Sequence, residues 1–216
     1  LNYSISVVDG DFLFVGGDWA LATVDLSDPA APHQRGFLTT RALAQDAVVV
    51  NGHLVVDLWE FPDAYYVQAF AVDDPDVIAP RGRLDQSGRL FARAGLLYQT
   101  RTDGIHVIEV DDAGQLQDLD TIHAEEPVGS VVTDGPYAAG IDGAGRLRVM
   151  EFTDPFTLVD RGVIDPVPGR DRRTRAMLGT LVFVEHDRPG NQWPWNDAWE
   201  IVDIGEPDAP VVVCEL

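Results

Sequence analysis

The sequence predicts an all-β fold, a β-propeller of five four-stranded antiparallel blades, and three observations favour it. The first is a recurring hairpin, two short apolar runs joined by a glycine-containing turn, as in residues 7–14 around Asp9-Gly10. The second is the regular spacing of these turns. Their glycines are separated by 42, 43, 40 and 44 residues and are Gly10, Gly52, Gly95, Gly135 and Gly179. The third is the absence of sustained helical periodicity. A repeat of about 40 to 45 residues is typical of propeller blades.

The first blade, predicted at residues 1–40, shows why each repeat holds four strands. Apolar and polar residues alternate before the turn, and two further apolar runs follow it. The loop after the third run contains Pro29 and Pro32, which lack the amide donor that a strand ladder needs. The four predicted strands are residues 4–8, 12–15, 21–26 and 33–38.

The same arrangement returns four times, so a single domain is expected over residues 1–216. The other predicted blades are residues 41–86, 87–123, 124–169 and 170–216. An Asp-Pro or Glu-Pro loop recurs in most blades, and Arg35-Gly36 recurs as Arg81-Gly82 and Arg161-Gly162. We expect the five repeats to form a ring, because closure hides sheet faces that an open array leaves in water. The alternative is that the chain is an excerpt of a longer propeller.

Two segments carry a resemblance to a known family. Residues 23–32 read TVDLSDPAAP and residues 201–210 read IVDIGEPDAP, with weaker copies at 72–75 and 152–155. In these segments the chain resembles the LVIVD-repeat β-propeller family of bacteria and archaea. The resemblance implies the fold and an extracellular or cell-surface location. It carries no catalytic residue set, because the family shares none.

Composition limits the possible partners. The net charge is −21, and all 15 basic residues are arginine. This excess of negative charge disfavours nucleic acid and anionic membranes. A salt-adapted or GC-rich source is an alternative origin of the bias. No apolar run reaches the length of about 18 residues that a membrane span needs, so no membrane insertion is expected. Cys214 is the sole cysteine, which excludes an internal disulfide.

Enzymatic activity is not favoured by the charged groups predicted at the channel mouth. Alignment on the hairpin glycines places five residues there, namely Ser4, Asp46, Arg89, Gly129 and Arg173. Hydrolysis of a glycosidic bond needs two converging carboxyl groups. Asp46 is the one carboxylate of this ring, and its alternative partners are Glu125 and Glu126. We therefore assign no catalytic residue.

No metal or cofactor site is predicted. The five histidines have no ligand spacing and are His33, His53, His106, His123 and His186. The segment 111–118 lacks the alternating acids of a calcium loop. No phosphate-binding glycine loop is present.

The candidate ligand-binding residues lie in loops predicted at the channel mouth. The longest, residues 186–197, begins with His186 and contains Trp193 and Trp195, two tryptophans that are unfavourable in water unless they contact something. They either cover the channel or form a stacking platform. The second-blade loop, residues 59–65, adds Trp59 and Tyr65. The remaining candidates are basic: Arg89, Arg170, Arg172 and Arg173.

These arginines either pair with neighbouring acids or recognise an anionic ligand. We expect a non-enzymatic module that binds a protein, peptide or carbohydrate at the channel mouth. The alternatives are a carbohydrate-active hydrolase that uses carboxylates there, and a purely structural module of a larger surface protein.

Overall fold

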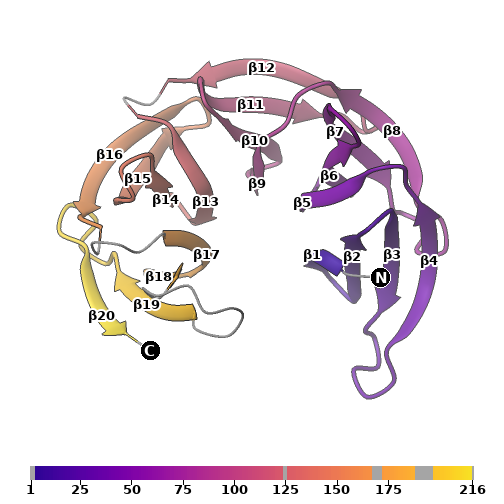
Figure 1. The fold of residues 1–216 in the computed structure, drawn as a ribbon, viewed down its shortest axis with the longest axis horizontal. Helices are drawn as coiled ribbons and strands as arrows, with labels where there is room; N and C mark the ends of the chain where they lie inside the picture. Colours follow the sequence, from indigo (N-terminus) through magenta and orange to yellow (C-terminus); the bar gives the residue numbers. More distant parts are fainter. Residues whose placement is uncertain (1–2, 124–125, 167–171, 188–196, 216) are drawn as a thin grey trace. The chain divides into compact units, whose positions relative to one another are not determined.

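The computed structural model describes residues 3–123, 126–166, 172–187 and 197–215. The described residues form twenty β-strands in five four-stranded antiparallel sheets, and in each sheet the strands lie in chain order (Figure 1). The protein is therefore a β-propeller of five four-stranded blades, which confirms the predicted fold class. By contact density the chain packs as two compact units, residues 1–99 with 107–119 and residues 100–106 with 120–216.

The first unit contains blades 1 and 2. Blade 1 consists of β1 (Tyr3–Asp9), β2 (Phe12–Gly17), β3 (Ala20–Asp25) and β4 (His33–Thr39). Blade 2 consists of β5 (Leu43–Val50), β6 (His53–Glu60), β7 (Ala64–Ala71) and β8 (Ala79–Leu84). The unit boundary passes through the third sheet. That sheet, blade 3, consists of β9 (Arg89–Arg93), β10 (Leu96–Arg101), β11 (Gly104–Val110) and β12 (Leu116–Ile122).

The second unit contains blades 4 and 5. Blade 4 consists of β13 (Val128–Asp134), β14 (Tyr137–Asp142), β15 (Leu147–Asp154) and β16 (Thr157–Ile164). Blade 5 consists of β17 (Arg172–Leu178), β18 (Leu181–Asp187), β19 (Asp197–Asp203) and β20 (Val211–Glu215).

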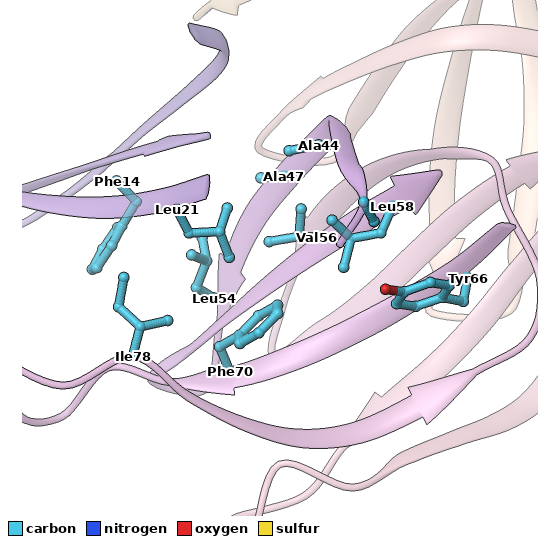
Figure 2. Close-up of a cluster of buried hydrophobic side chains, with 11 residues drawn as sticks. Phe14, Leu21, Ala44, Ala47, Leu54, Val56, Leu58, Tyr66, Phe70 and Ile78 are labelled. Atoms are coloured by element: carbon cyan, nitrogen blue, oxygen red, sulfur yellow. The ribbon is translucent and has the colours of Figure 1, made fainter. Parts of the chain in front are cut away.

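The central strands of each blade are buried on both faces. In β6, Leu54, Val56 and Leu58 are at most 1% exposed and belong to a cluster that includes Phe14 and Leu21 of blade 1 (Figure 2). Val55 points to the opposite face, where its cluster includes Val67 of β7 and Leu90 and Leu97 of blade 3. Each such side chain contributes roughly 1.5–3 kcal/mol on burial.

The second unit has a similar cluster between blades 4 and 5. It includes Val149 of β15 and Val182 and Val202 of blade 5, none of which is measurably exposed. Apolar packing between neighbouring sheets therefore stabilises both units.

The hairpin turns also connect neighbouring blades. All five predicted turn glycines have a positive φ, between 56° and 77°, and Asn51 before Gly52 has a φ of 49°. Asn and Gly tolerate this conformation, which hairpin turns of this kind require. The Asn51 Nδ2 donates to the carbonyls of Gly95, at 3.0 Å, and Val110, at 2.9 Å. In the second unit, the Gly179 amide donates to the Asp134 Oδ2 at 2.7 Å.

The recurring Arg-Gly pair contacts the loop of the next blade. Arg35 donates to both carboxylate oxygens of Asp76, at 2.7 and 2.9 Å, and a Cβ at Gly36 would lie only 2.7 Å from the Pro75 carbonyl oxygen. Gly82 donates its amide to the Gly114 carbonyl at 2.9 Å. Glycine is needed here because the strand and the loop approach too closely for a side chain.

We expect Gly82→Ala to lower the free energy of unfolding by about 1–3 kcal/mol. A Cβ at this position would lie 2.6 Å from the Gly114 carbonyl oxygen and 2.7 Å from the Leu116 amide nitrogen, and backbone cannot move aside as a flexible side chain can. Urea unfolding followed by circular dichroism measures the change. Gly143→Ala is the control, because a Cβ there meets nothing within 4 Å. Equal stability of the two variants would contradict the close-packing argument.

Candidate functional site

Asp46, predicted at the channel mouth, has a second carboxylate as its neighbour. It lies on β5 directly opposite Asp57 of β6 in the antiparallel register. Opposed residues of such a pair point to the same face of the sheet. Asp46 is therefore not the lone carboxylate that the alignment on the hairpin glycines predicts, because Asp57 of the neighbouring strand lies beside it.

Both carboxylates are held by groups of the chain around β9. The Asp46 Oδ2 accepts a hydrogen bond from the Leu90 amide at 2.8 Å, and the Asp57 Oδ2 accepts one from the Ser87 hydroxyl at 3.1 Å. The Asp57 Oδ1 is buried and has no hydrogen-bond partner among the described residues. Arg89, which is exposed, donates to the Gln45 carbonyl at 3.3 Å. These contacts join blade 2 to blade 3.

Burial dominates the proton affinity of this pair. Asp57 is 3% exposed, and desolvation raises its pKa to about 6. The Asp46 charge raises that pKa further, whereas the Ser87 hydroxyl, the Gly88 amide and the Arg89 charge lower it. Burial also raises the pKa of Asp46, and the Leu90 amide opposes this change. The pair therefore takes up protons at higher pH than ordinary aspartates.

A second feature of the same face of blade 2 is a group of aromatic side chains, Trp59, Phe61 and Tyr65, which we call the aromatic surface. Trp59 lies opposite Tyr65 in the register, and their rings stack with centroids 6.0 Å apart at an interplanar angle of 11°. Phe61 packs edge-on against Trp59 at 6.2 Å. Phe61 is 72% exposed and Tyr65 is 45% exposed, so much of the aromatic surface faces water.

The loop of the hairpin that carries this surface is shorter than expected, because both strands are longer. Trp59 and Glu60 belong to β6, and Ala64 and Tyr65 belong to β7, which leaves residues 61–63 as the turn. The sequence predicts a loop over residues 59–65, and the strands extend into it at both ends. The strands continue because the Trp59–Tyr65 cross-strand pair stabilises the ladder. The Trp59 Nε1 donates to the Pro62 carbonyl at 3.2 Å, which fixes the indole on the hairpin.

The predicted basic candidates in blade 5 have different surroundings. Arg170 lies outside the described residues. Arg172 is buried, and its Nη2 donates to both carboxylate oxygens of Glu200, at 3.1 and 2.9 Å. Its Nη1 donates to the Asp165 carbonyl at 2.9 Å. This internal ion pair accounts for Arg172 without a ligand. Arg173, the next residue on β17, is exposed.

The long loop predicted in blade 5 is only partly described. His186 was expected in the loop but lies in β18, where it is paired with Ala198 of β19. Trp193 and Trp195 lie outside the described residues. Of the predicted aromatic ligand-binding residues, the structure therefore describes the two in blade 2, Trp59 and Tyr65.

Most described arginines are paired with acids. The pairs are Arg35–Asp76, Arg83–Asp85, Arg101–Asp103, Arg146–Asp142, Arg148–Asp160, Arg161–Glu151, Arg172–Glu200 and Arg175–Glu185. These pairs leave little unneutralised positive charge for an anionic ligand. The acidic residues Asp18, Glu60 and Asp63 have no ion-pair partner within the described ranges.

Among the described residues, no group of three or more His, Cys, Asp or Glu side chains is arranged to hold a metal ion. No helix in that part of the chain is long and apolar enough to span a membrane.

Comparison with known proteins supports the fold alone. No family model and no curated protein matches the chain. Among solved structures it is similar to a periplasmic gluconolactonase of Pseudomonas aeruginosa, with a TM-score of 0.74 and 13% identity over 97% of this chain and 70% of that one. It is also similar to the Swd1 β-propeller domain of Myceliophteria thermophila, with a TM-score of 0.65 and 14% identity over 100% and 73%.

A third similar structure is a quinonprotein alcohol dehydrogenase-like protein of Bacteroides thetaiotaomicron. Its TM-score is 0.60, with 13% identity over 100% of this chain and 55% of that one. At these identities the shared β-propeller architecture does not transfer an activity.

Proposed function

We propose that this β-propeller is a non-enzymatic binding module. Its ligand is a protein, a peptide or a carbohydrate, and it binds through the aromatic surface of blade 2. The observation that carries the proposal is the stacked Trp59–Tyr65 pair beside the exposed Phe61. Large exposed aromatic side chains are costly in water, and they dominate the energetics of many binding interfaces. They also stack on sugars and on peptide side chains with little loss of conformational entropy.

The internal bonding of the hairpin supports a binding role. Because the Trp59 indole N–H already donates to the Pro62 carbonyl, the indole is held before a ligand arrives. Such preorganisation lowers the entropy cost of association. The net charge of −21 and the paired arginines disfavour nucleic acid as the ligand.

The test is a binding screen on arrays of glycans and peptides with the wild type, Trp59→Ala and Tyr65→Ala. We expect each substitution to weaken the binding of any ligand found by tenfold or more, which corresponds to about 1.4 kcal/mol. Phe156→Ala is the matched control, since Phe156 is 42% exposed and lies in the second unit. Unchanged affinity in both blade 2 variants would exclude the aromatic surface.

The opposed Asp46 and Asp57 support a second candidate function, hydrolysis of a glycosidic bond. Two neighbouring carboxyl groups, one protonated and one ionised, are the groups this reaction uses. The binding module is favoured over it, because Asp57 is 3% exposed whereas Phe61 and Tyr65 are 72% and 45% exposed. Release of nitrophenol from aryl glycosides, abolished in Asp46→Asn, would support the hydrolase. No release by the wild type would argue against it.

A further inference from the structure

We propose that the ligand of the aromatic surface is a basic peptide segment, with a Lys or Arg side chain stacked on the Trp59–Tyr65 rings. This inference rests on the proposed function and specifies its ligand. It starts from the charge of the hairpin, which carries Glu60 and Asp63 among its three aromatic side chains. The exposed Asp63 lies at the turn itself.

The acidic character extends along the sequence around the aromatic surface. No arginine or lysine occurs between Arg41 and Arg81, and of the seven acidic residues in this segment Glu60 and Asp63 lie on the hairpin itself. The corresponding turn of blade 1, between β2 and β3, repeats the combination of an acid and an aromatic residue. Its Asp18 is followed by Trp19, which is 44% exposed. An acidic surface with exposed aromatic rings attracts cations and repels anions.

Cation–π attraction favours the same ligand. The Trp59 N–H is used within the hairpin, and Tyr65 and Phe61 contact the indole ring, so a partner meets the remaining part of the half-buried indole together with the exposed rings of Tyr65 and Phe61. The face of an indole attracts Arg and Lys more strongly than the faces of other aromatic side chains do. A contact of this kind occurs on the opposite face of the same blade, where the guanidinium carbon of Arg83 of β8 lies 3.6 Å from the ring centroid of Tyr66 of β7.

A peptide is favoured over a small cation because more than one acid and more than one exposed ring are present. Glu60 and Asp63 can pair with a second basic side chain while the rings hold the first. Each additional charge pair raises the association rate and the dependence on salt.

The test compares three synthetic peptides of the same length and sequence except at one set of positions. These positions are all Arg in the first peptide, all Gln in the second and all Glu in the third. Binding is measured by fluorescence anisotropy of a labelled peptide on the intact chain at 50 and 500 mM salt. We expect the Arg peptide to bind at least tenfold more tightly than the Gln peptide, the Glu peptide not to bind, and the affinity to fall at high salt. Trp59→Ala should weaken binding of the Arg peptide by tenfold or more.

The charge contribution is tested without altering a ring. In Glu60→Gln/Asp63→Asn the affinity for the Arg peptide should fall about fivefold or more, with a smaller salt dependence. Asp73→Asn/Asp74→Asn is the matched control: it removes the same charge from the loop between β7 and β8 and should leave the affinity nearly unchanged.

The outcomes separate this inference from the proposed function. Equal, Trp59-dependent binding of the Arg and Gln peptides, or of a neutral glycan, would overturn the basic ligand and keep the binding module. Equal binding of the Arg peptide to the wild type and to Trp59→Ala would contradict both the basic ligand and the binding role of the aromatic surface. It would show that the peptide is attracted non-specifically to the acidic chain. Tetramethylammonium binding as tightly as the Arg peptide would overturn the peptide in favour of a small cation.

Discussion

Replacing Arg172 with Gln is expected to lower the free energy of unfolding by about 3–5 kcal/mol, the usual effect of breaking a buried ion pair. The side chains of Arg172 and Glu200 are both 2% exposed. Without the guanidinium, the Glu200 carboxylate would stay buried with no opposite charge, and the Asp165 carbonyl would lose its donor. The change is read from urea unfolding followed by circular dichroism.

Arg175→Gln is a closely matched control, because it makes the same substitution three residues along β17. The side chain of Arg175 is 47% exposed, and its partner is Glu185. Solvent screens such a pair, so we expect a loss below about 1 kcal/mol. Similar losses in the two variants would contradict the distinction between a buried and an exposed pair.

The double variant Arg172→Met/Glu200→Leu distinguishes two quantities. One is the net contribution of the ion pair to the free energy of unfolding, and the other is the loss caused by leaving one buried charge without its partner. Replacing both charges with apolar side chains leaves no uncompensated charge, so most of the stability should return. Failure of the double variant to exceed Arg172→Gln would show that the interior cannot accept these side chains in place of the ion pair.

The second large effect is a gain in stability at high pH when Asp57 is replaced with Asn. The pKa of Asp57 is raised to about 6 in the folded state, from an ordinary value of 3.8. The folded protein therefore binds more protons than the unfolded chain between these two values. The stability from this group is present below about pH 4 and is lost as the pH rises through about 6. The shift corresponds to about 3 kcal/mol.

We accordingly expect Asp57→Asn to match the wild type near pH 4 and to exceed it by up to about 3 kcal/mol at pH 8. The neutral amide keeps the shape of the carboxyl group and removes the buried charge beside Asp46. The difference in unfolding free energy between the two proteins, measured at several pH values, isolates this group from the other titrating residues. A carbon-13 NMR titration of the carboxyl group measures its pKa directly.

Asp63→Asn serves as the control, since Asp63 is exposed on the turn of the same blade. Its stability difference from the wild type should not vary with pH in this manner. A difference for Asp57→Asn that is constant from pH 4 to pH 8 would contradict the raised pKa.

The fold was predictable because its determinants are local. The glycines of the five turns have the positive φ that the sequence implied, and their spacing indicated the number of blades. The ends of the hairpins were less predictable. Residues such as Trp59 and His186 follow apolar runs and precede prolines, which favours a loop, yet their cross-strand partners keep them in strands.

The carboxylate pair could have been found from the sequence. Counting outward from Asn51-Gly52 pairs Val50 with His53 and, four steps later, Asp46 with Asp57, as the register shows. The Arg172–Glu200 pair was harder to find, because its partners lie 28 residues apart on strands that are not adjacent. In a strand of consecutive arginines, side chains point alternately inward and outward, but the sequence does not show which of them point inward. In the structure Arg172 is buried and Arg173 is exposed.

The hydrogen bonds between hairpin turns bear on how the protein is made on the ribosome. Asn51 bonds to residues 44 and 59 positions ahead of it, and Asp134 to a residue 45 positions ahead. At about 5–20 residues per second, the Asn51 amide therefore waits roughly 2–9 s before its first acceptor has been synthesised. A nascent blade 2 is thus left with an unpaired turn until the hairpin of blade 3 emerges. Slow codons between Asn51 and Val110 would prolong that interval, in which a chaperone or a protease can act on the incomplete chain.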